Sequence, residues 1–92
     1  MTTNNTFNYE AAKAELKEQY GNACFDEYEI DGAKGLLIGN NECYDGNDFY
    51  HYFLTETALY KCYYDTIDEE GNEIELDCID YDAPAQMIKI GR

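Results

Sequence analysis

The residues of this 92-residue chain with the clearest chemical potential are carboxylates gathered in one short segment. Residues 65–82, DTIDEEGNEIELDCIDYD, carry nine acidic side chains and no lysine or arginine. Carboxylates at this density can bind metal ions, work as an acid–base pair, or attract a basic macromolecule. These chemistries need different spacings, so the spacing of the side chains discriminates between them.

Metal binding requires spacings that the chain lacks. A calcium-binding EF-hand loop needs a glycine at position 6, oxygen ligands at positions 1, 3 and 5, and a glutamate at position 12. With Gly71 at position 6, Thr66 falls at position 1 and Asp77 at position 12; with Gly46 there, Tyr52 falls at position 12. The four cysteines form no C-x-x-C pair and the chain has one histidine, so the ligand spacing of zinc sites is also missing. We therefore expect no metal and no other cofactor.

Catalysis is not indicated by any motif. The single histidine, His51, lies in FYHYFLT among aromatic residues, a setting that favours packing over proton transfer. The glycines are scattered at predicted turns and form no phosphate-binding loop. Folding can bring a cysteine and a histidine together without any trace in the sequence, but no pattern points to such a pair. We expect a protein that is not an enzyme.

The acidic segment has the spacing of a β-strand that is charged on one side. Glu73, Glu75 and Asp77 alternate with apolar residues, which places their carboxylates about 6.8 Å apart along a strand. Rows of separated negative charges are what DNA presents to its protein partners. The row therefore either forms the solvated face of a very acidic protein, where it serves solubility only, or imitates a phosphate backbone.

The overall charge indicates the kind of partner. Twenty acidic residues against six basic ones give a formal charge of −14, whereas a magnitude of about 2 to 8 is enough for solubility. Direct binding to nucleic acids or anionic membranes is disfavoured, because both require a positive protein surface. We expect a basic protein partner, such as a nucleic-acid-binding protein or a nuclease complex, whose binding weakens as salt rises.

The short length, the charge of −14, the acidic segment DTIDEEGNEIELDCIDYD and the lack of an enzymatic motif have a counterpart among known proteins. Together they resemble the small phage-encoded inhibitors of host defence, including anti-CRISPR and other DNA-mimic proteins. The resemblance is to a class without a common fold or motif, so it assigns no residue. It implies binding to a nuclease or another defence protein at a basic nucleic-acid site, without turnover.

The predicted contact surface combines the carboxylates of the acidic segment with two tyrosines, because aromatic residues are enriched at interface hot spots. Its members are Tyr63, Asp65, Asp68, Glu69, Glu70, Glu73, Glu75, Asp77, Asp80, Tyr81 and Asp82. The alternative function is a small acidic accessory domain that binds a protein, or a second copy of itself, through a sheet edge.

The elements that must position these residues form one α+β domain over residues 1–92. Residues 1–6 are polar and expected to be flexible, and a helix over about 7–20 is expected to be capped by Thr6 or Asn8. After Gly21, short apolar runs alternate with turn clusters, which predicts strands between about 24 and 90. We expect the N-terminal helix to pack on an antiparallel β meander of four or five strands. The run after Pro84 is the predicted edge strand.

The acidic segment is predicted to be the second half of a hairpin with a five-residue loop over 68–72. Ile67 then lies opposite Glu73, and Cys62 lies opposite Cys78. A slip of one residue would bury the carboxylates, so the apolar pattern favours this register. The two cysteines would be a buried reduced pair or, in some geometries, a disulfide.

The compartment follows from what the sequence lacks. The N-terminus has neither a basic nor an apolar stretch typical of a signal peptide, and no run approaches the roughly 20 apolar residues of a membrane span. We expect a cytoplasmic protein, in the host cytoplasm if it is viral, with reduced and mostly buried cysteines.

Overall fold

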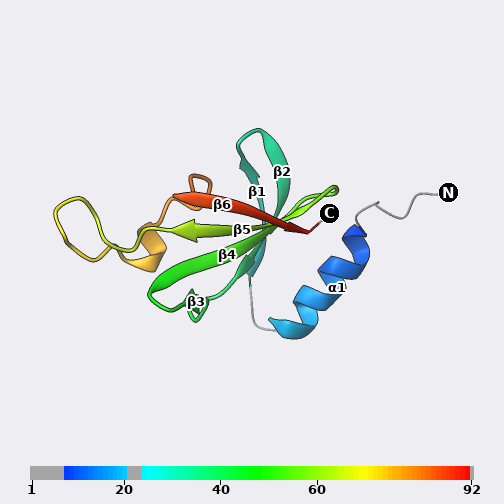
Figure 1. Cartoon of the computed structure of the whole chain (residues 1–92), viewed down its shortest axis with the longest axis horizontal. Coiled ribbons are helices and arrows are strands. Elements are labelled where there is room, and N and C mark those ends of the chain that lie inside the picture. Colours follow the sequence, from blue (N-terminus) through cyan, green and yellow to red (C-terminus); the bar gives the residue numbers. More distant parts are fainter. Residues whose placement is uncertain (1–7, 21–23, 92) are drawn as a thin grey trace.

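The fold is described from a computed structural model, which places residues 8–20 and 24–91. One helix packs on a six-stranded antiparallel sheet (Figure 1). The elements are α1 (Tyr9–Gln19), β1 (Cys24–Ile30), β2 (Ala33–Gly39), β3 (Tyr44–Asp45), β4 (Asp48–Leu54), β5 (Leu59–Tyr64), the 3₁₀ turn η1 (Leu76–Cys78) and β6 (Gln86–Gly91). The strand order is β1-β2-β4-β5-β6, and the short β3 pairs with β4. The predicted α+β meander is confirmed, with one extra strand from the polar connection after β2.

Helix α1 begins at the cap that the sequence suggested. The Asn8 side chain accepts a hydrogen bond from the Ala11 N–H at 3.0 Å, which satisfies one of the free donors of the first turn. Leu16 is the buried residue of the helix, and it packs with Ile38 and Leu54 of the sheet. The alternative cap Thr6 and the segment 1–6 lie outside the described residues.

The two faces of the sheet have separate apolar clusters, because successive side chains of a strand point to opposite faces. Leu54 and Ile38 lie on the face covered by α1, which we call the helix-side face. Phe49, Phe53 and Cys62 are fully buried on the other face, which we call the far face. The alternation in FYHYFLT therefore divides β4 between two cores.

Tight turns connect β1 to β2 and β4 to β5. Asp31 and Gly32 have φ values of 54° and 82°, as a two-residue hairpin turn with matching twist requires. The β4–β5 connection is a tight hairpin in which the Thr55 N–H donates to the Ala58 carbonyl at 2.9 Å. β4 and β5 are therefore two separate strands joined by a turn.

The predicted acidic hairpin is correct only near its loop. Ile67 does pair with Glu73, but Leu76–Cys78 forms the turn η1 in place of a strand. Strand β6 takes the edge of β5, so Cys62 lies opposite Met87, and Cys78 is exposed. Two predictions are therefore wrong: that the carboxylates form an alternating row on a strand, and that Cys62 pairs with Cys78.

The physical reason lies in the charge of the two competing segments. Pairing residues 74–80 with β5 would have set Glu75 opposite Asp65, and like charges in that position are destabilising. Strand β6 contains no carboxylate, and its Met87 packs against the far-face cluster. The strand without carboxylates consequently replaces the acidic segment beside β5.

The described cysteine side chains are free: Cys43 and Cys62 are buried, and Cys78 is exposed. Among residues 8–20 and 24–91, no helix has the length and apolar character to cross a membrane.

Candidate partner-binding surface

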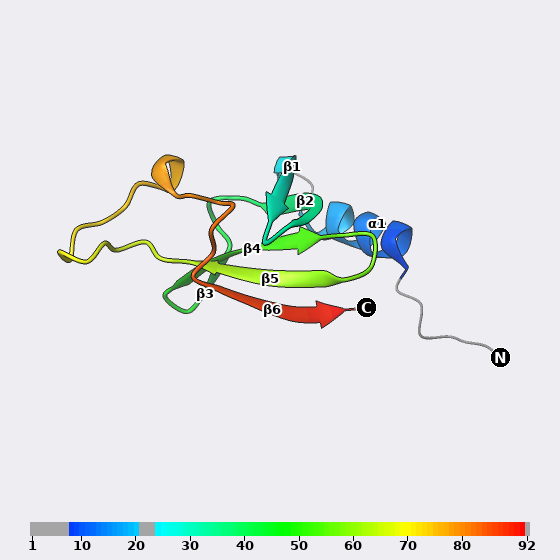
Figure 2. The same ribbon diagram turned by 90° about the horizontal axis from the view of Figure 1, so that it is seen from above.

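The acidic segment, residues 65–82, leaves the sheet after β5 and returns to it before β6. Figures 1 and 2 show its first half, in yellow, extending beyond the end of the sheet, away from α1. All nine of its carboxylate side chains are exposed. Within the part of the chain that the structure describes, the one ion pair joins Lys61 to Asp45, outside the segment. No described cation of the chain therefore forms an ion pair with a carboxylate of the segment.

The tip of the segment is ordered by one of its own carboxylates. Asp68 accepts hydrogen bonds from the N–H groups of Glu70 and Asn72, each at 2.9 Å. Gly71 closes the turn with a φ of 86°, which suits glycine. Asp68 thus shapes the loop, while Glu69 and Glu70 remain exposed at its tip.

The second half of the segment, residues 74–82, packs back on the far face, and we call it the return segment. Leu76, Ile79 and Tyr81 contact the far-face cluster. The Tyr64 hydroxyl donates to the Tyr81 carbonyl at 2.8 Å, and the Tyr81 hydroxyl donates to the Leu76 carbonyl at 2.9 Å. These contacts fix the position of the carboxylates that the return segment carries. Tyr81, predicted as a contact residue, is half-buried and acts here as an anchor.

The ring of His51 supports this anchor from within the sheet. It lies parallel to the Tyr81 ring, with the centroids 5.0 Å apart and the planes inclined by 19°. Its Nε2 lies 3.3 Å from the Asn40 carbonyl, and burial lowers the pKa of His51 below its usual value. The structure therefore gives the histidine a packing contact with the return segment.

Two carboxylates of the return segment are close enough to affect each other. Asp82, through a shared hydrogen bond and its charge, raises the pKa of Asp80. The charge of Asp82 therefore disfavours the ionised form of Asp80. In the described residues, no group of three or more His, Cys, Asp or Glu side chains is arranged to hold a metal ion.

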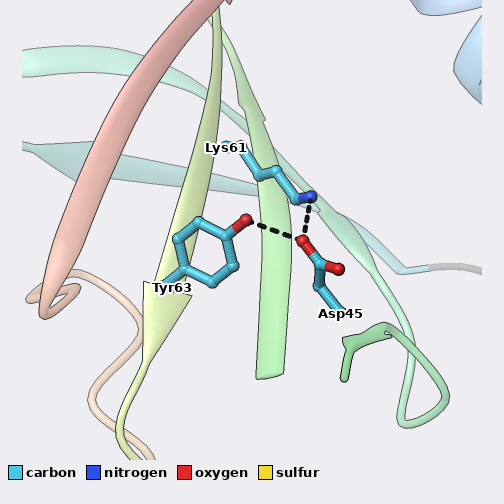
Figure 3. A network of polar contacts seen from close by, with 3 residues as sticks. All are labelled: Asp45, Lys61 and Tyr63. Atoms are coloured by element: carbon cyan, nitrogen blue, oxygen red, sulfur yellow. Dashed lines mark hydrogen bonds and ion pairs between the residues drawn. The ribbon is translucent and has the colours of Figure 1, made fainter. Parts of the chain in front are cut away.

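Tyr63 belongs to a polar cluster on the helix-side face. The Asp45 carboxylate accepts from the Lys61 Nζ at 3.2 Å and from the Tyr63 hydroxyl at 3.1 Å (Figure 3). The Lys61 Nζ also lies 4.3 Å from the centroid of the Tyr50 ring. The hydrogen bonds from Lys61 and Tyr63 lower the pKa of Asp45, while Tyr63 and Asp45 raise the pKa of Lys61. The charge of Lys61 is therefore engaged by Asp45 and Tyr50 of the same chain.

A row of half-buried tyrosines extends from this cluster along the helix-side face. The ring centroids of Tyr20 and Tyr52 are 5.8 Å apart, those of Tyr52 and Tyr50 are 5.5 Å apart, and those of Tyr50 and Tyr63 are 6.2 Å apart. Sequence reasoning missed this row, although strand alternation already placed Tyr50 and Tyr52 on one face. The missing information was the β4–β5 register, which sets Tyr50 opposite Tyr63.

A small cleft joins the tyrosine row to the acidic segment. It has a volume of about 220 Å³ and lies where β4 begins and β5 ends, between Asp48 and Asp65 and beside Tyr63. Two carboxylates and an aromatic ring suit the side chain of an arginine or lysine. The candidate surface therefore contains the predicted carboxylates together with Tyr63, and it excludes the ring of Tyr81.

No known protein family, curated protein or solved structure matches this chain in the comparisons made.

Proposed function

We propose that this protein is a noncatalytic inhibitor, of the anti-defence type encoded by phages, that occupies a basic nucleic-acid site on a partner protein. The observation that supports the proposal is the exposure of all nine carboxylates of the acidic segment, none of which forms an ion pair with a cation among residues 8–20 and 24–91. A surface of this kind is electrostatically complementary to a nuclease or another nucleic-acid-binding protein, as in anti-CRISPR-like inhibition. The imitation rests on charge density and exposure, and not on the strand spacing of about 6.8 Å expected from the sequence.

Anchoring of the segment adds to the affinity that charge alone would give. The return segment is held by Tyr64, Tyr81 and His51, so its carboxylates lose little conformational freedom when a partner binds. Each contact with a basic site displaces ions, and four such contacts weaken binding on the order of 100-fold between about 0.05 and 0.2 M salt. Binding is therefore expected to be tight at low salt and lost at about 0.5 M salt.

The test compares two variants that change the net charge equally at different places. Three exposed carboxylates are neutralised in each: Glu69→Gln, Glu70→Gln and Glu73→Gln in the acidic segment, and Asp26→Asn, Glu27→Gln and Glu29→Gln in β1. The tagged proteins are used to capture partners from bacterial lysate at low and high salt. A captured nucleic-acid-binding protein is then purified and tested for displacement of its labelled nucleic acid.

We expect the wild type and the β1 variant to capture the partner and displace its nucleic acid equally well. The segment variant should remain folded but should neither capture the partner nor displace the nucleic acid. Equal loss in both variants would mean that only net charge matters. Salt-resistant capture, or binding that leaves the nucleic acid in place, would contradict the proposal.

A second candidate function is an accessory domain that binds a partner through a sheet edge, its acidity serving solubility only. One observation favours it: the edge strand β6 exposes Ile88 and Ile90. Such a protein would keep its partner in both neutralised variants, so the same experiment separates the two functions.

A further inference from the structure

The sheet has two edges with opposite character. Edge strand β1 carries Asp26, Glu27 and Glu29, all exposed, and charges on an edge strand discourage pairing with another chain. Edge strand β6 has no carboxylate in its sequence. Its Ile88 and Ile90 are 39% and 50% exposed, although both are large apolar residues. One edge of the sheet is therefore protected against pairing, and the other is open to it.

We propose that β6 pairs with β6 of a second copy of this chain, antiparallel about a two-fold axis, to form one continuous sheet. Charge determines where two copies of the chain can meet. Two molecules with a formal charge of −14 repel each other wherever carboxylates meet, which rules out contact through β1 or through the acidic segment. Strand β6 offers free backbone groups, apolar side chains and Lys89, so two copies can approach there.

The register of this pairing follows from strand geometry. Residues directly opposite each other in an antiparallel pair point to the same face, so the axis must pass through a pair of identical residues. The longest pairing places the axis at the middle of β6, at Ile88–Ile88 or Lys89–Lys89. The second choice sets two lysines opposite each other, which is destabilising. The first sets Ile88 against its own copy, Lys89 against the partner's Met87, and Ile90 against the partner's Gln86. We therefore place the axis at Ile88.

This arrangement also keeps the most charged parts of the two copies apart. The acidic segment precedes β6 and lies at the end of the sheet where β6 begins (Figure 1). Because the second β6 runs in the opposite direction, the second acidic segment emerges at the other end of the joined sheet. Both segments remain free for basic partners, so the pairing does not depend on the proposed inhibitory function.

Cysteine crosslinking tests both the pairing and its register. In a Cys78→Ser background, which removes the one described cysteine that is exposed, Ile88→Cys brings two thiols opposite each other at the axis. Ile90→Cys is the close control, since its two copies would be offset by four residues, or about 14 Å along the strands. Ile67→Cys is the distant control, because Ile67 is 58% exposed but lies in the acidic segment.

We expect mild oxidation to convert most of the Ile88→Cys protein into a disulfide-linked dimer and to leave both control variants largely monomeric. Without oxidant, sedimentation of the wild-type protein should show a dimer whose fraction increases with salt, because salt screens the repulsion between copies. Ile88→Glu should shift that protein to the 10.6 kDa monomer with an unchanged circular dichroism spectrum.

A wild-type monomer at every salt and protein concentration would overturn the proposal, as would equal crosslinking of all three cysteine variants. Preferential crosslinking through Lys89→Cys would overturn the arrangement about Ile88. The salt dependence separates this proposal from the inhibitory function, because salt strengthens pairing of like-charged copies and weakens binding to a basic partner.

Discussion

A methyl group added at Gly39 tests whether the buried ring of His51 positions the return segment. The Cβ atom of an alanine there would lie 2.3 Å from Cδ2 and 2.4 Å from Cγ of His51, where ordinary contacts are 3.4–4 Å. The ring would have to move by about 1 Å, the difference between 3.4 and 2.3 Å. Since the ring lies parallel to that of Tyr81, this movement would disturb the anchor of the acidic segment.

The magnitude follows from known effects of overpacking. Forcing extra volume into a packed core costs about 1–3 kcal/mol, and a disrupted aromatic pair adds about 0.5–1.5 kcal/mol. Alanine also restricts the backbone of the unfolded chain more than glycine does, which raises the free energy of unfolding by about 0.4–1 kcal/mol. We therefore expect Gly39→Ala to lower the free energy of unfolding by about 2 kcal/mol, which lowers Tm by roughly 8–16 °C in a domain of this size.

A double-mutant cycle identifies the clash as the cause. Thermal unfolding is followed by circular dichroism for Gly39→Ala, His51→Ala and the double variant. Removing the ring removes the clash, so the double variant should be more stable than the sum of the single effects by about 1–2 kcal/mol.

The matched control is Gly35→Ala, whose Cβ would meet the backbone carbonyl oxygen of Leu54. Removal of the His51 ring cannot relieve that contact, so Gly35→Ala and His51→Ala should be additive. Additive effects of Gly39→Ala and His51→Ala would refute the reasoning.

Two further outcomes concern the same anchor. Burial lowers the pKa of His51, so as pH falls below about 6.5 the unfolded chain binds the proton first, and the native state loses up to about 1 kcal/mol between pH 6.5 and 5.5. Urea denaturation at several pH values should show that loss in the wild type, and His51→Gln should lack it; an identical pH dependence in both proteins would count against a buried neutral ring. Tyr64→Phe leaves the Tyr81 carbonyl without its 2.8 Å hydrogen bond, at a cost of about 1–2 kcal/mol. Amide hydrogen exchange should then accelerate in residues 74–82 more than in β4, and a uniform acceleration would contradict local anchoring.

Local patterns were sufficient to predict most of the elements. The helix followed from its composition and from Asn8, and the strands followed from short apolar runs bounded by turn residues. The loop over 68–72 was also predicted, because Ile67 and Glu73 are brought together by the loop itself. Each of these features depends on residues close together in the sequence.

The features that were missed depend on distant parts of the chain. Residues 73–78 and 86–91 were both predicted to be strands, so the local pattern could not decide which of them pairs with β5. That choice depended on repulsion from Asp65 and on the packing of Met87, which become visible only when both candidates are compared against the same strand. The tyrosine row was missed for a similar reason, since it required the register of β4 against β5.

The distribution of charge argues that the carboxylates of the acidic segment are present for binding and not for folding. Strands β2, β5 and β6 contain no carboxylate, and in β4 the only one is Asp48 at its first position. The sheet therefore folds on side chains that are mostly neutral, while nine of the twenty acidic residues lie in a segment that makes no described ion pair. Concentrating charge there opposes folding through self-repulsion. Apart from Asp68, which orders the loop, these carboxylates can be neutralised without loss of a described hydrogen bond from a backbone N–H. A charge that the fold does not need, kept exposed on an anchored segment, supports the proposed binding to a basic partner.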